Sequence, residues 1–120
     1  MILGVGVDIV ENERMNEKLV DRILGEDELK RLPSVKEKKI EYLSSRFAAK
    51  EAFFKAIGTG LNGFSFKDVQ VMNDPDGKPY LSFSDGMSNF LRMRKVRKVH
   101  LSISHERKYS VAIVIIEGSE

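Results

Sequence analysis

The amino-acid sequence predicts an α+β domain in which a mostly antiparallel sheet packs against one long helix. Three observations support this prediction: an alternating apolar segment near the N-terminus, a long helical pattern in the middle of the chain, and two pairs of β-branched runs joined by polar turns. The expected order of elements is β, α, α, β, β, α, β, β. This order favours antiparallel pairing with helices packed on the sheet, and it does not suit a doubly wound nucleotide fold.

The first strand and the first helices are expected before residue 33. The N-terminal segment alternates between apolar side chains and a second face that carries Gly4, Gly6 and Asp8, which is the period of a strand. Because glycine has no side chain, the two glycines predict open space beside Asp8. Residues 12–32 predict two short helices broken near Gly25, and the proline that follows is a stop signal.

The long helix is expected over residues 35–57, where apolar residues recur at steps of three and four and glycines follow as a left-handed C-terminal cap. The apolar stripe consists of Ile40, Leu43, Phe47, Phe54 and Ile57. Glu51 falls on the same stripe, between Phe47 and Phe54. A carboxylate in that position needs either a structural or a functional explanation.

The remaining elements are two hairpins with a helix between them. A β-hairpin is expected within residues 67–84, around the Asp-Pro-Asp-Gly turn at 74–77. A helix over residues 85–95 follows, and then two β-branched runs at 99–105 and 110–117 predict the second hairpin.

Length and composition bound the class of protein. The 120 residues predict one domain, 1–120, and the absence of cysteine excludes both disulfides and thiolate metal sites, so a cytoplasmic setting is expected. The N-terminal apolar run is short and contains an early aspartate, which predicts neither a signal peptide nor a membrane span. The net charge is only +2, but residues 92–98 carry five cations and no acid. An anionic partner and a solvated helix end both explain that run.

Asp8 and Glu51 are the first candidates for chemistry, because each interrupts a face that would otherwise pack. An unpaired buried carboxylate is costly, so such a group is normally matched by a cation, by hydrogen-bond donors or by a metal. A structural explanation for Glu51 is an ion pair with Lys55, four residues later on the same helix. The functional explanation is that both carboxylates bind one Mg²⁺, with water and substrate phosphates as the other ligands.

Cations on the same helix suggest an anionic ligand. Arg46, Lys50 and Lys55 are spread over one broad side of the helix, where an arginine can bind a phosphate through two nitrogens and a lysine can act as a mobile charge. A solvated basic flank explains them equally well. His105, at the exit of an expected strand, is a candidate ligand contact, although a histidine there is more often a turn residue.

The first helical segment carries a basic ridge. Arg14, Lys18 and Arg22 lie four residues apart, beside Met15 and Leu19. A cationic ridge next to an apolar strip suits an acidic helical partner. Acidic residues interleave with the ridge, so an ordinary surface helix remains an alternative.

Four segments together resemble the small holo-[acyl-carrier-protein] synthase group of 4'-phosphopantetheinyl transferases. The segments are GVGVDIVENER, RFAAKEAFFKAIGTG, GKPYL and LSISHE, in the order and at roughly the spacing of that group. The resemblance implies the transferase fold and transfer of the 4'-phosphopantetheine arm of coenzyme A to a serine of apo acyl carrier protein, in support of fatty acid biosynthesis. It also implies a homotrimer whose sites are shared between neighbouring subunits, with no nucleic-acid or membrane partner.

The resemblance also assigns roles to residues. It implies that Asp8 and Glu51 bind Mg²⁺ and that Lys55, as a third catalytic residue, neutralises charge near the pyrophosphate. The residues expected to contact coenzyme A are Arg46, Lys50, Lys55, Gly77, Lys78, Pro79 and His105. Arg14 is expected to contact the acidic carrier protein, and Lys18 and Arg22 are weaker candidates for the same contact, because the stretch that follows Arg14 looks shorter than in some members.

Two alternatives come from other classes of protein. The basic run 92–98 suits a nucleic-acid-binding module, which would show steeply salt-dependent binding and no role for Asp8 or Glu51. A trimeric interaction domain without activity would keep the fold, but it has no need of two carboxylates and Lys55 around one space.

Overall fold

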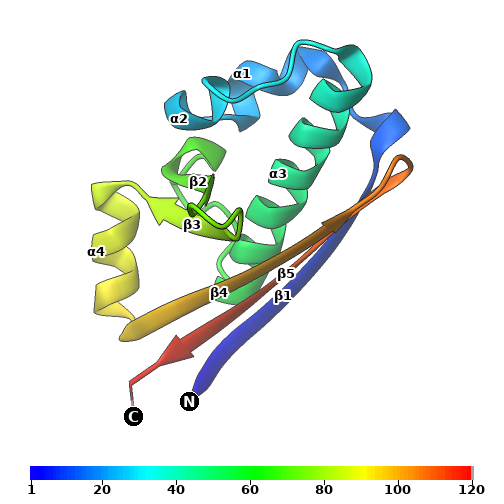
Figure 1. Cartoon of the computed structure of the whole chain (residues 1–120). Coiled ribbons are helices and arrows are strands. Elements are labelled where there is room, and N and C mark those ends of the chain that lie inside the picture. The colour runs from blue at the N-terminus through cyan, green and yellow to red at the C-terminus, as the bar shows by residue number, and fades with distance from the viewer. Residues whose placement is uncertain (120) are drawn as a thin grey trace.

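The computed structural model describes residues 1–119, and it confirms the predicted α+β fold (Figure 1). The elements, in chain order, are β1 (Ile2–Glu11), the 3-10 helices η1 (Asn12–Arg14) and η2 (Glu17–Leu19), α1 (Val20–Ile23), α2 (Glu26–Leu29), α3 (Lys36–Ile57), η3 (Phe66–Asp68), β2 (Val69–Asn73), β3 (Pro79–Phe83), α4 (Asp85–Met93), β4 (Val96–His105) and β5 (Tyr109–Gly118).

Two antiparallel sheets surround the long helix α3. The larger sheet has the strand order β1-β5-β4, and α3 lies across one of its faces (Figure 1). In this sheet Asp8 of β1 lies opposite Ala112 of β5, which lies opposite Ile103 of β4. The strands β2 and β3 form the smaller sheet, which contacts α3 and β4. Both predicted hairpins are therefore present.

The glycine face of β1 packs directly on α3, which corrects the expectation of open space beside Asp8. A Cβ on Gly4 would lie 1.9 Å from the carbonyl oxygen of Ala56, and one on Gly6 would lie 1.9 Å from the carbonyl oxygen of Ala52. No real Cβ tolerates such distances, so only glycine lets the two backbones meet here. Asp8 is the next residue on this face of β1, and the contact brings it to the last turns of α3.

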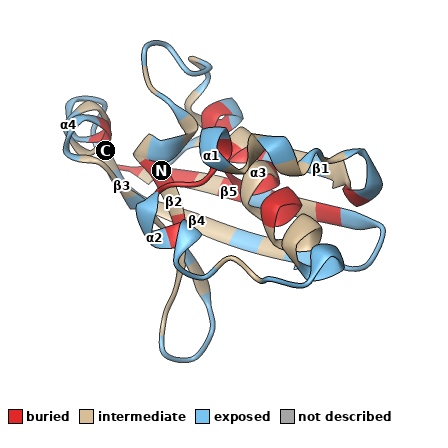
Figure 2. Cartoon of the chain, turned by 90° about the horizontal axis from the view of Figure 1, so that it is seen from above, coloured by how far each residue is buried: buried red, intermediate tan, exposed pale blue. Residues whose placement is uncertain are grey.

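The buried surface of α3 is wider than the apolar stripe predicted from its sequence. Ala48, Ala52 and Phe53 are fully buried, whereas Phe47 and Ile57 are only half-buried (Figure 2). The reason is that the larger sheet covers one side of α3 while β2 and α1 contact it elsewhere. Small alanines face the sheet, because the glycines of β1 draw the strand so close.

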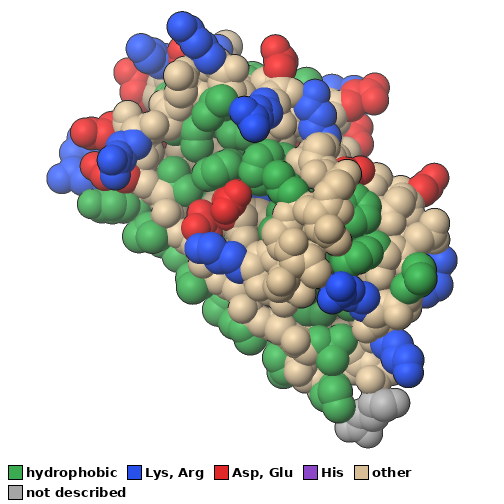
Figure 3. Space-filling view, turned by 180° about the vertical axis from the view of Figure 1, so that it is seen from behind, with side chains coloured by type: hydrophobic (Ala, Val, Ile, Leu, Met, Phe, Trp, Pro, Cys, Tyr) green, Lys and Arg blue, Asp and Glu red, His purple; other side chains and the backbone are tan. Residues whose placement is uncertain are grey.

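The apolar residues of β1 point away from α3 and form an exposed row. Leu3, Val5, Val7 and Ile9 are 44%, 57%, 56% and 62% exposed, and Ile113, paired with Val7 on β5, is 39% exposed. Hydrophobic side chains line one edge of the molecule in the space-filling view (Figure 3). A contiguous exposed apolar surface of this kind marks an interaction site.

Several element boundaries differ from those predicted. The segment 12–32 contains four short pieces instead of two helices, although the break at Gly25 is present. The helix expected over 85–95 ends at Met93, because Lys95 takes a left-handed φ of 62°, and β4 begins at Val96. Among residues 1–119, no helix is long and apolar enough to cross a membrane.

Candidate active site

Asp8 and Glu51 line one cavity, as the metal hypothesis requires. Asp8 comes from the inner face of β1 and Glu51 from α3, two turns before its end. The cavity has a volume of about 380 Å³, and its other lining residues are Ile9, Val10, Glu11, Arg14, Met15, Leu19 and Phe47. Asp8 and Glu51 thus share a cavity with a third carboxylate, Glu11, with an exposed arginine and with an apolar wall.

Lys55 forms an ion pair with Asp8. Its Nζ lies 2.9 Å from Oδ1 of Asp8 and donates a second hydrogen bond, of 3.2 Å, to the carbonyl oxygen of Val7. The sequence left open a pair between Lys55 and Glu51. Within the described part of the chain the Glu51 carboxylate takes part in no ion pair, so that structural explanation of Glu51 is wrong.

The electrostatic environment of Glu51 favours a cation. Burial raises the pKa of the Glu51 carboxyl group, and the nearby charge of Asp8 raises it further, while Lys55 partly opposes the shift. Two carboxylates that repel each other are stabilised by a positive ion bound between them. The raised pKa of Glu51 and its lack of an ion pair among the described residues therefore both favour a bound cation at this carboxylate.

The donor set fits Mg²⁺. In residues 1–119 no group of three or more histidine, aspartate and glutamate side chains could hold a metal ion by itself. Mg²⁺ is usually held by one or two carboxylates, and it keeps water or substrate phosphate as its other ligands. Asp8 and Glu51 supply two hard oxygen ligands, which is the number that such a site requires.

A second cavity lies on the other side of Glu51. It has a volume of about 320 Å³ and is lined by Glu51, Phe54, Lys55, Gly58, Gly60 and Leu61. Gly58 and Gly60 have left-handed φ angles of 82° and 64°, and there is open space where their side chains would be. Glu51 is common to both cavities.

Arg46 connects α3 to the turn between β2 and β3. Its guanidinium lies 3.9 Å from the ring centre of Tyr42 and donates a hydrogen bond of 3.3 Å to the side chain of Asn73. Asn73 in turn donates to the carbonyl oxygen of Gly77, at 3.0 Å. The structure therefore brings together two of the predicted coenzyme A contacts, Arg46 and the turn that contains Gly77.

Lys50 is not available to a ligand, which corrects the prediction that it contacts coenzyme A. Its side chain is 0% exposed, and its Nζ donates to Oε1 of Glu28 at 2.6 Å and to the carbonyl oxygen of Ile23 at 2.5 Å. Burial lowers the pKa of the Lys50 ammonium, and the carboxylate of Glu28 opposes the shift. The helix turns Lys50 into the protein although its neighbour Glu51 faces the cavities.

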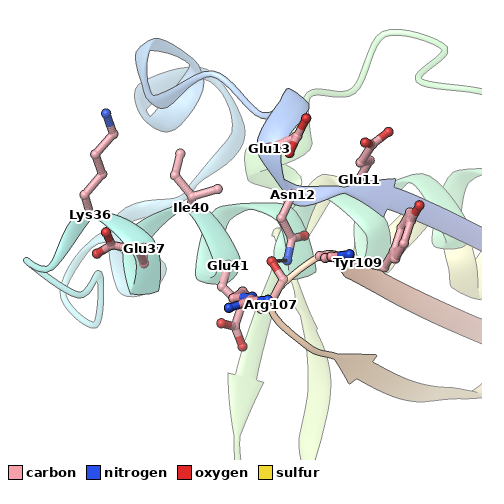
Figure 4. Close-up of a pocket in the computed structure, with 10 residues that line it drawn as sticks. Glu11, Asn12, Glu13, Lys36, Glu37, Ile40, Glu41, Arg107 and Tyr109 are labelled. Atoms are coloured by element: carbon pink, nitrogen blue, oxygen red, sulfur yellow. Dashed lines mark hydrogen bonds between the residues drawn. The ribbon is translucent and has the colours of Figure 1, made fainter.

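The other predicted coenzyme A contacts lie away from the cavity of Asp8 and Glu51. Lys78 and Pro79 line a cavity of about 340 Å³ between β3 and β4. His105, at the end of β4, is hydrogen-bonded to Glu41 of α3, and Glu41 lines a further cavity of about 710 Å³ (Figure 4). Neither cavity contains Asp8 or Glu51.

The predicted basic ridge is not continuous. Arg14, Lys18 and Arg22 are all exposed, but they belong to three different short elements, η1, η2 and α1. Arg14 lines the cavity of Asp8 and Glu51, and the other two cations do not line it. The structure therefore singles out Arg14, which was also the strongest of the three predictions.

Comparison with known proteins identifies the family. The model of the 4'-phosphopantetheinyl transferase superfamily matches residues 4–114. The chain belongs to this superfamily. A holo-[acyl-carrier-protein] synthase from Geobacillus sp. (strain WCH70) is 49% identical over 98% of this chain and 98% of that protein. The family predicted from the four sequence segments is confirmed.

Solved structures of superfamily members have the same fold. Holo-[acyl-carrier-protein] synthase from Neisseria meningitidis matches with a TM-score of 0.89 and 38% identity, covering 98% of this chain and 99% of that one. The synthase from Bacillus anthracis str. Ames, solved in complex with CoA (3',5'-ADP), matches with a TM-score of 0.83 and 41% identity, over 99% of both chains.

Sequence reasoning missed the buried or paired partners of two predicted site residues, and it missed the place of a third residue in the cavity. Glu28, the buried partner of Lys50, and Glu41, the partner of His105, lie in charged segments that look like ordinary surface helices. No local signal distinguishes them, since both partners are distant in the sequence. Phe47 was assigned to the apolar core stripe of the long helix. Its half-buried position in the cavity that Met15 also lines depends on how β1 and the segment after it lie against α3, which the sequence alone does not show.

Proposed function

We propose that this chain transfers the 4'-phosphopantetheine arm of coenzyme A to a serine hydroxyl of an apo acyl carrier protein and releases adenosine 3',5'-bisphosphate, in support of fatty acid biosynthesis. The observation that carries the proposal is that Asp8 and Glu51 line one cavity, while Lys55 forms an ion pair with Asp8 and lines a second cavity that also contains Glu51, in a member of the 4'-phosphopantetheinyl transferase superfamily. The relatives named above are holo-[acyl-carrier-protein] synthases.

The chemistry follows from charge. In the transfer, the bond between the serine oxygen and the β-phosphorus of coenzyme A forms, the bond from that phosphorus to the departing bisphosphate breaks, and the serine hydroxyl proton passes to a base, either a water or a carboxylate of the site. Asp8 and Glu51 would hold Mg²⁺, which when bound supplies positive charge to the phosphate oxygens. Lys55 stabilises negative charge on the leaving oxygen, because its ammonium is mobile and half exposed.

Arg14 and the apolar wall next to it suit the carrier protein. Arg14 is exposed at the cavity of Asp8 and Glu51, and Met15, Leu19 and Phe47 form the adjoining wall. An acidic helical partner would bind the cation and cover the apolar side chains, and its serine would then enter the cavity. Lys18 and Arg22 are exposed nearby in sequence and add a weaker, long-range attraction.

A homotrimer with shared sites explains how the coenzyme A contacts meet. Within one chain, Arg46, the turn that contains Gly77 and Lys78, and His105 do not line the cavity of Asp8 and Glu51. The exposed apolar row on β1 provides the surface on which a neighbouring subunit can pack. A neighbour's residues would then complete the coenzyme A site, and each interface would lie next to a catalytic centre.

The location of the protein is proposed from composition. The chain has no cysteine that an oxidising compartment would pair, and its substrates in this proposal are coenzyme A and a carrier protein. We therefore expect the protein in the cytoplasm, without a membrane or nucleic-acid partner.

The experiment that tests the function is a mass measurement. The protein is incubated with coenzyme A and an apo acyl carrier protein, with Mg²⁺ or with excess chelator, and the carrier is weighed by mass spectrometry. We expect the carrier to gain the mass of one phosphopantetheine only when Mg²⁺ is present. A folded protein that modifies none of several carriers in the presence of Mg²⁺ would contradict the proposal.

A further inference from the structure

Lys55 lines the cavity that shares Glu51 with the cavity of Asp8, and its ammonium forms an ion pair with the carboxylate of Asp8, one of the two proposed metal ligands. We propose that Lys55 is an exchangeable counter-ion: it neutralises Asp8 in the free protein and moves to a phosphate of the ligand when coenzyme A binds. Binding of the divalent cation and binding of the diphosphate are thereby coupled. The inference rests on the proposed function, since it concerns the same site.

The geometry of Lys55 supports this exchange. Lys55 stands one helical turn after Glu51, and it lines the 320 Å³ cavity on the far side of Glu51 from the cavity that Asp8 lines. Its Nζ nevertheless reaches across to Oδ1 of Asp8, at 2.9 Å, and to the carbonyl oxygen of Val7, at 3.2 Å. The side chain therefore lines one cavity while its charge is paired with a carboxylate that lines the other.

The ion pair is weak enough to be reversible. The Lys55 side chain is 54% exposed and that of Asp8 is 16% exposed, so solvent screens much of their attraction. Because one partner is half in solvent, the pair holds Lys55 less firmly than a fully buried pair would. By contrast, the Lys50–Glu28 pair on the same helix is fully buried and is fixed by further hydrogen bonds, so it cannot serve as a mobile charge.

The 320 Å³ cavity offers Lys55 a place to meet an anion. Gly58 and Gly60 leave open space at this cavity, and the end of α3 lies beside it. A phosphate that enters from this side comes within reach of a flexible lysine rooted in the cavity wall. Lys55 can turn toward such a phosphate without any change in the backbone of α3, because only its side-chain dihedrals need to change.

Coupling between the two ligands follows from charge. While Lys55 is paired with Asp8, a divalent cation that approaches Asp8 meets a positive charge and one occupied carboxylate oxygen. A diphosphate that attracts Lys55 removes that charge and frees the oxygen, so it raises the affinity for the cation. By linkage, the cation raises the affinity for the diphosphate by the same factor.

The test compares Mn²⁺ binding by four variants, with Mn²⁺ as a paramagnetic probe for the oxygen-ligand site and coenzyme A as the diphosphate. Free Mn²⁺ is measured by electron paramagnetic resonance with and without coenzyme A. Without coenzyme A, we expect Lys55→Gln to bind Mn²⁺ about tenfold more tightly than the unchanged protein, and Lys55→Arg to bind it about equally, because arginine keeps the pair with Asp8. The factor by which coenzyme A strengthens Mn²⁺ binding should be about tenfold smaller in Lys55→Gln.

Two further variants separate the possible failures. Arg14→Gln removes a cation that lines the cavity of Asp8 and Glu51 but forms no ion pair with Asp8, and we expect it to change the Mn²⁺ affinity by less than about twofold. If it raises the Mn²⁺ affinity as much as Lys55→Gln does, the exchange is overturned, because any nearby positive charge would then have the same effect. Equal affinity of Lys55→Gln and the unchanged protein would also overturn it. Glu51→Gln should weaken Mn²⁺ binding, and if it does not, the metal site of the proposed function fails regardless of Lys55.

Discussion

Replacing Glu28 by alanine should be among the most destabilising single changes in this protein. Oε1 of Glu28 accepts hydrogen bonds from Lys50 Nζ at 2.6 Å and from the backbone N–H of Gly25 at 2.9 Å, and Oε2 accepts from the backbone N–H of Val71 at 2.9 Å. Both side chains of the ion pair are 0% exposed. The carboxylate thus joins α2, α3 and β2 in the interior.

The magnitude follows from what the substitution leaves behind. Removing one partner of a buried ion pair costs about 3–5 kcal/mol, and a buried N–H without an acceptor costs about 1–3 kcal/mol. These contributions overlap, so we expect Glu28→Ala to lower the free energy of unfolding by about 4–5 kcal/mol. Lys50→Met should cost less, about 3 kcal/mol, because Glu28 keeps its two backbone donors.

Urea denaturation at one fixed protein concentration measures these costs, since an oligomer's apparent stability depends on concentration. Lys30→Ala is the control, because Lys30 pairs with Asp27 at 3.5 Å on the surface, where both side chains are at least half exposed. We expect it to cost no more than about 0.5 kcal/mol. If Glu28→Ala costs no more than Lys30→Ala, the reasoning about the buried pair is refuted.

The remaining predictions concern packing, pH and assembly. Gly6→Ala should lower the free energy of unfolding by at least about 3 kcal/mol, because the new Cβ would collide with the backbone of α3. Gly86→Ala, whose new Cβ would make only an ordinary contact, should raise the free energy of unfolding by up to about 1 kcal/mol, because alanine favours the helix α4. Equal effects of the two substitutions in denaturation experiments would contradict the packing argument. Burial and the charge of Asp8 raise the pKa of Glu51, and a protonated carboxyl group does not bind a metal ion. As the pH is lowered, the Mn²⁺ affinity should therefore begin to fall at a pH above the range in which an ordinary glutamate titrates. A Mn²⁺ affinity that stays constant down to that range would contradict the prediction. If the proposed homotrimer packs through the apolar row of β1, Ile9→Asp should lower the mass measured by sedimentation to that of one chain, while Val35→Asp, at another exposed apolar position, should leave the mass unchanged. A trimeric Ile9→Asp would exclude this row as the interface.

The elements that the sequence predicts well are those with local signals. The end of α3 at Gly58, where φ is 82°, and the hairpin turn at residues 74–77 depend on residues that are close in the chain. The strand alternation of β1 was also recognised. The expectation that its glycines leave open space was wrong, because Gly6 packs on the backbone of α3 while the apolar Val7 is exposed.

The sequence could nominate the residues of the candidate site, but it could not predict the contacts between them. Asp8, Glu51 and Lys55 share a pattern and a resemblance that point to them, but the pairing of Lys55 with Asp8 joins residues 47 positions apart. Lys50 is a second case in which a distant partner could not be predicted from the sequence. It directly precedes Glu51 on the same helix as Arg46 and Lys55, and only its partner Glu28, 22 positions away, explains why it is buried.

The most direct test of the central claim is the transfer rate of Glu51→Gln, which keeps the size of the side chain and removes its charge. The rate of phosphopantetheine addition to an acyl carrier protein is measured at saturating Mg²⁺, together with the melting temperature of the variant. The account predicts that transfer is abolished while the melting temperature stays within a few degrees of the unchanged protein, because Glu51 makes no ion pair among residues 1–119. A variant that is equally stable and transfers at the normal rate would contradict the assignment of Glu51 as a metal ligand.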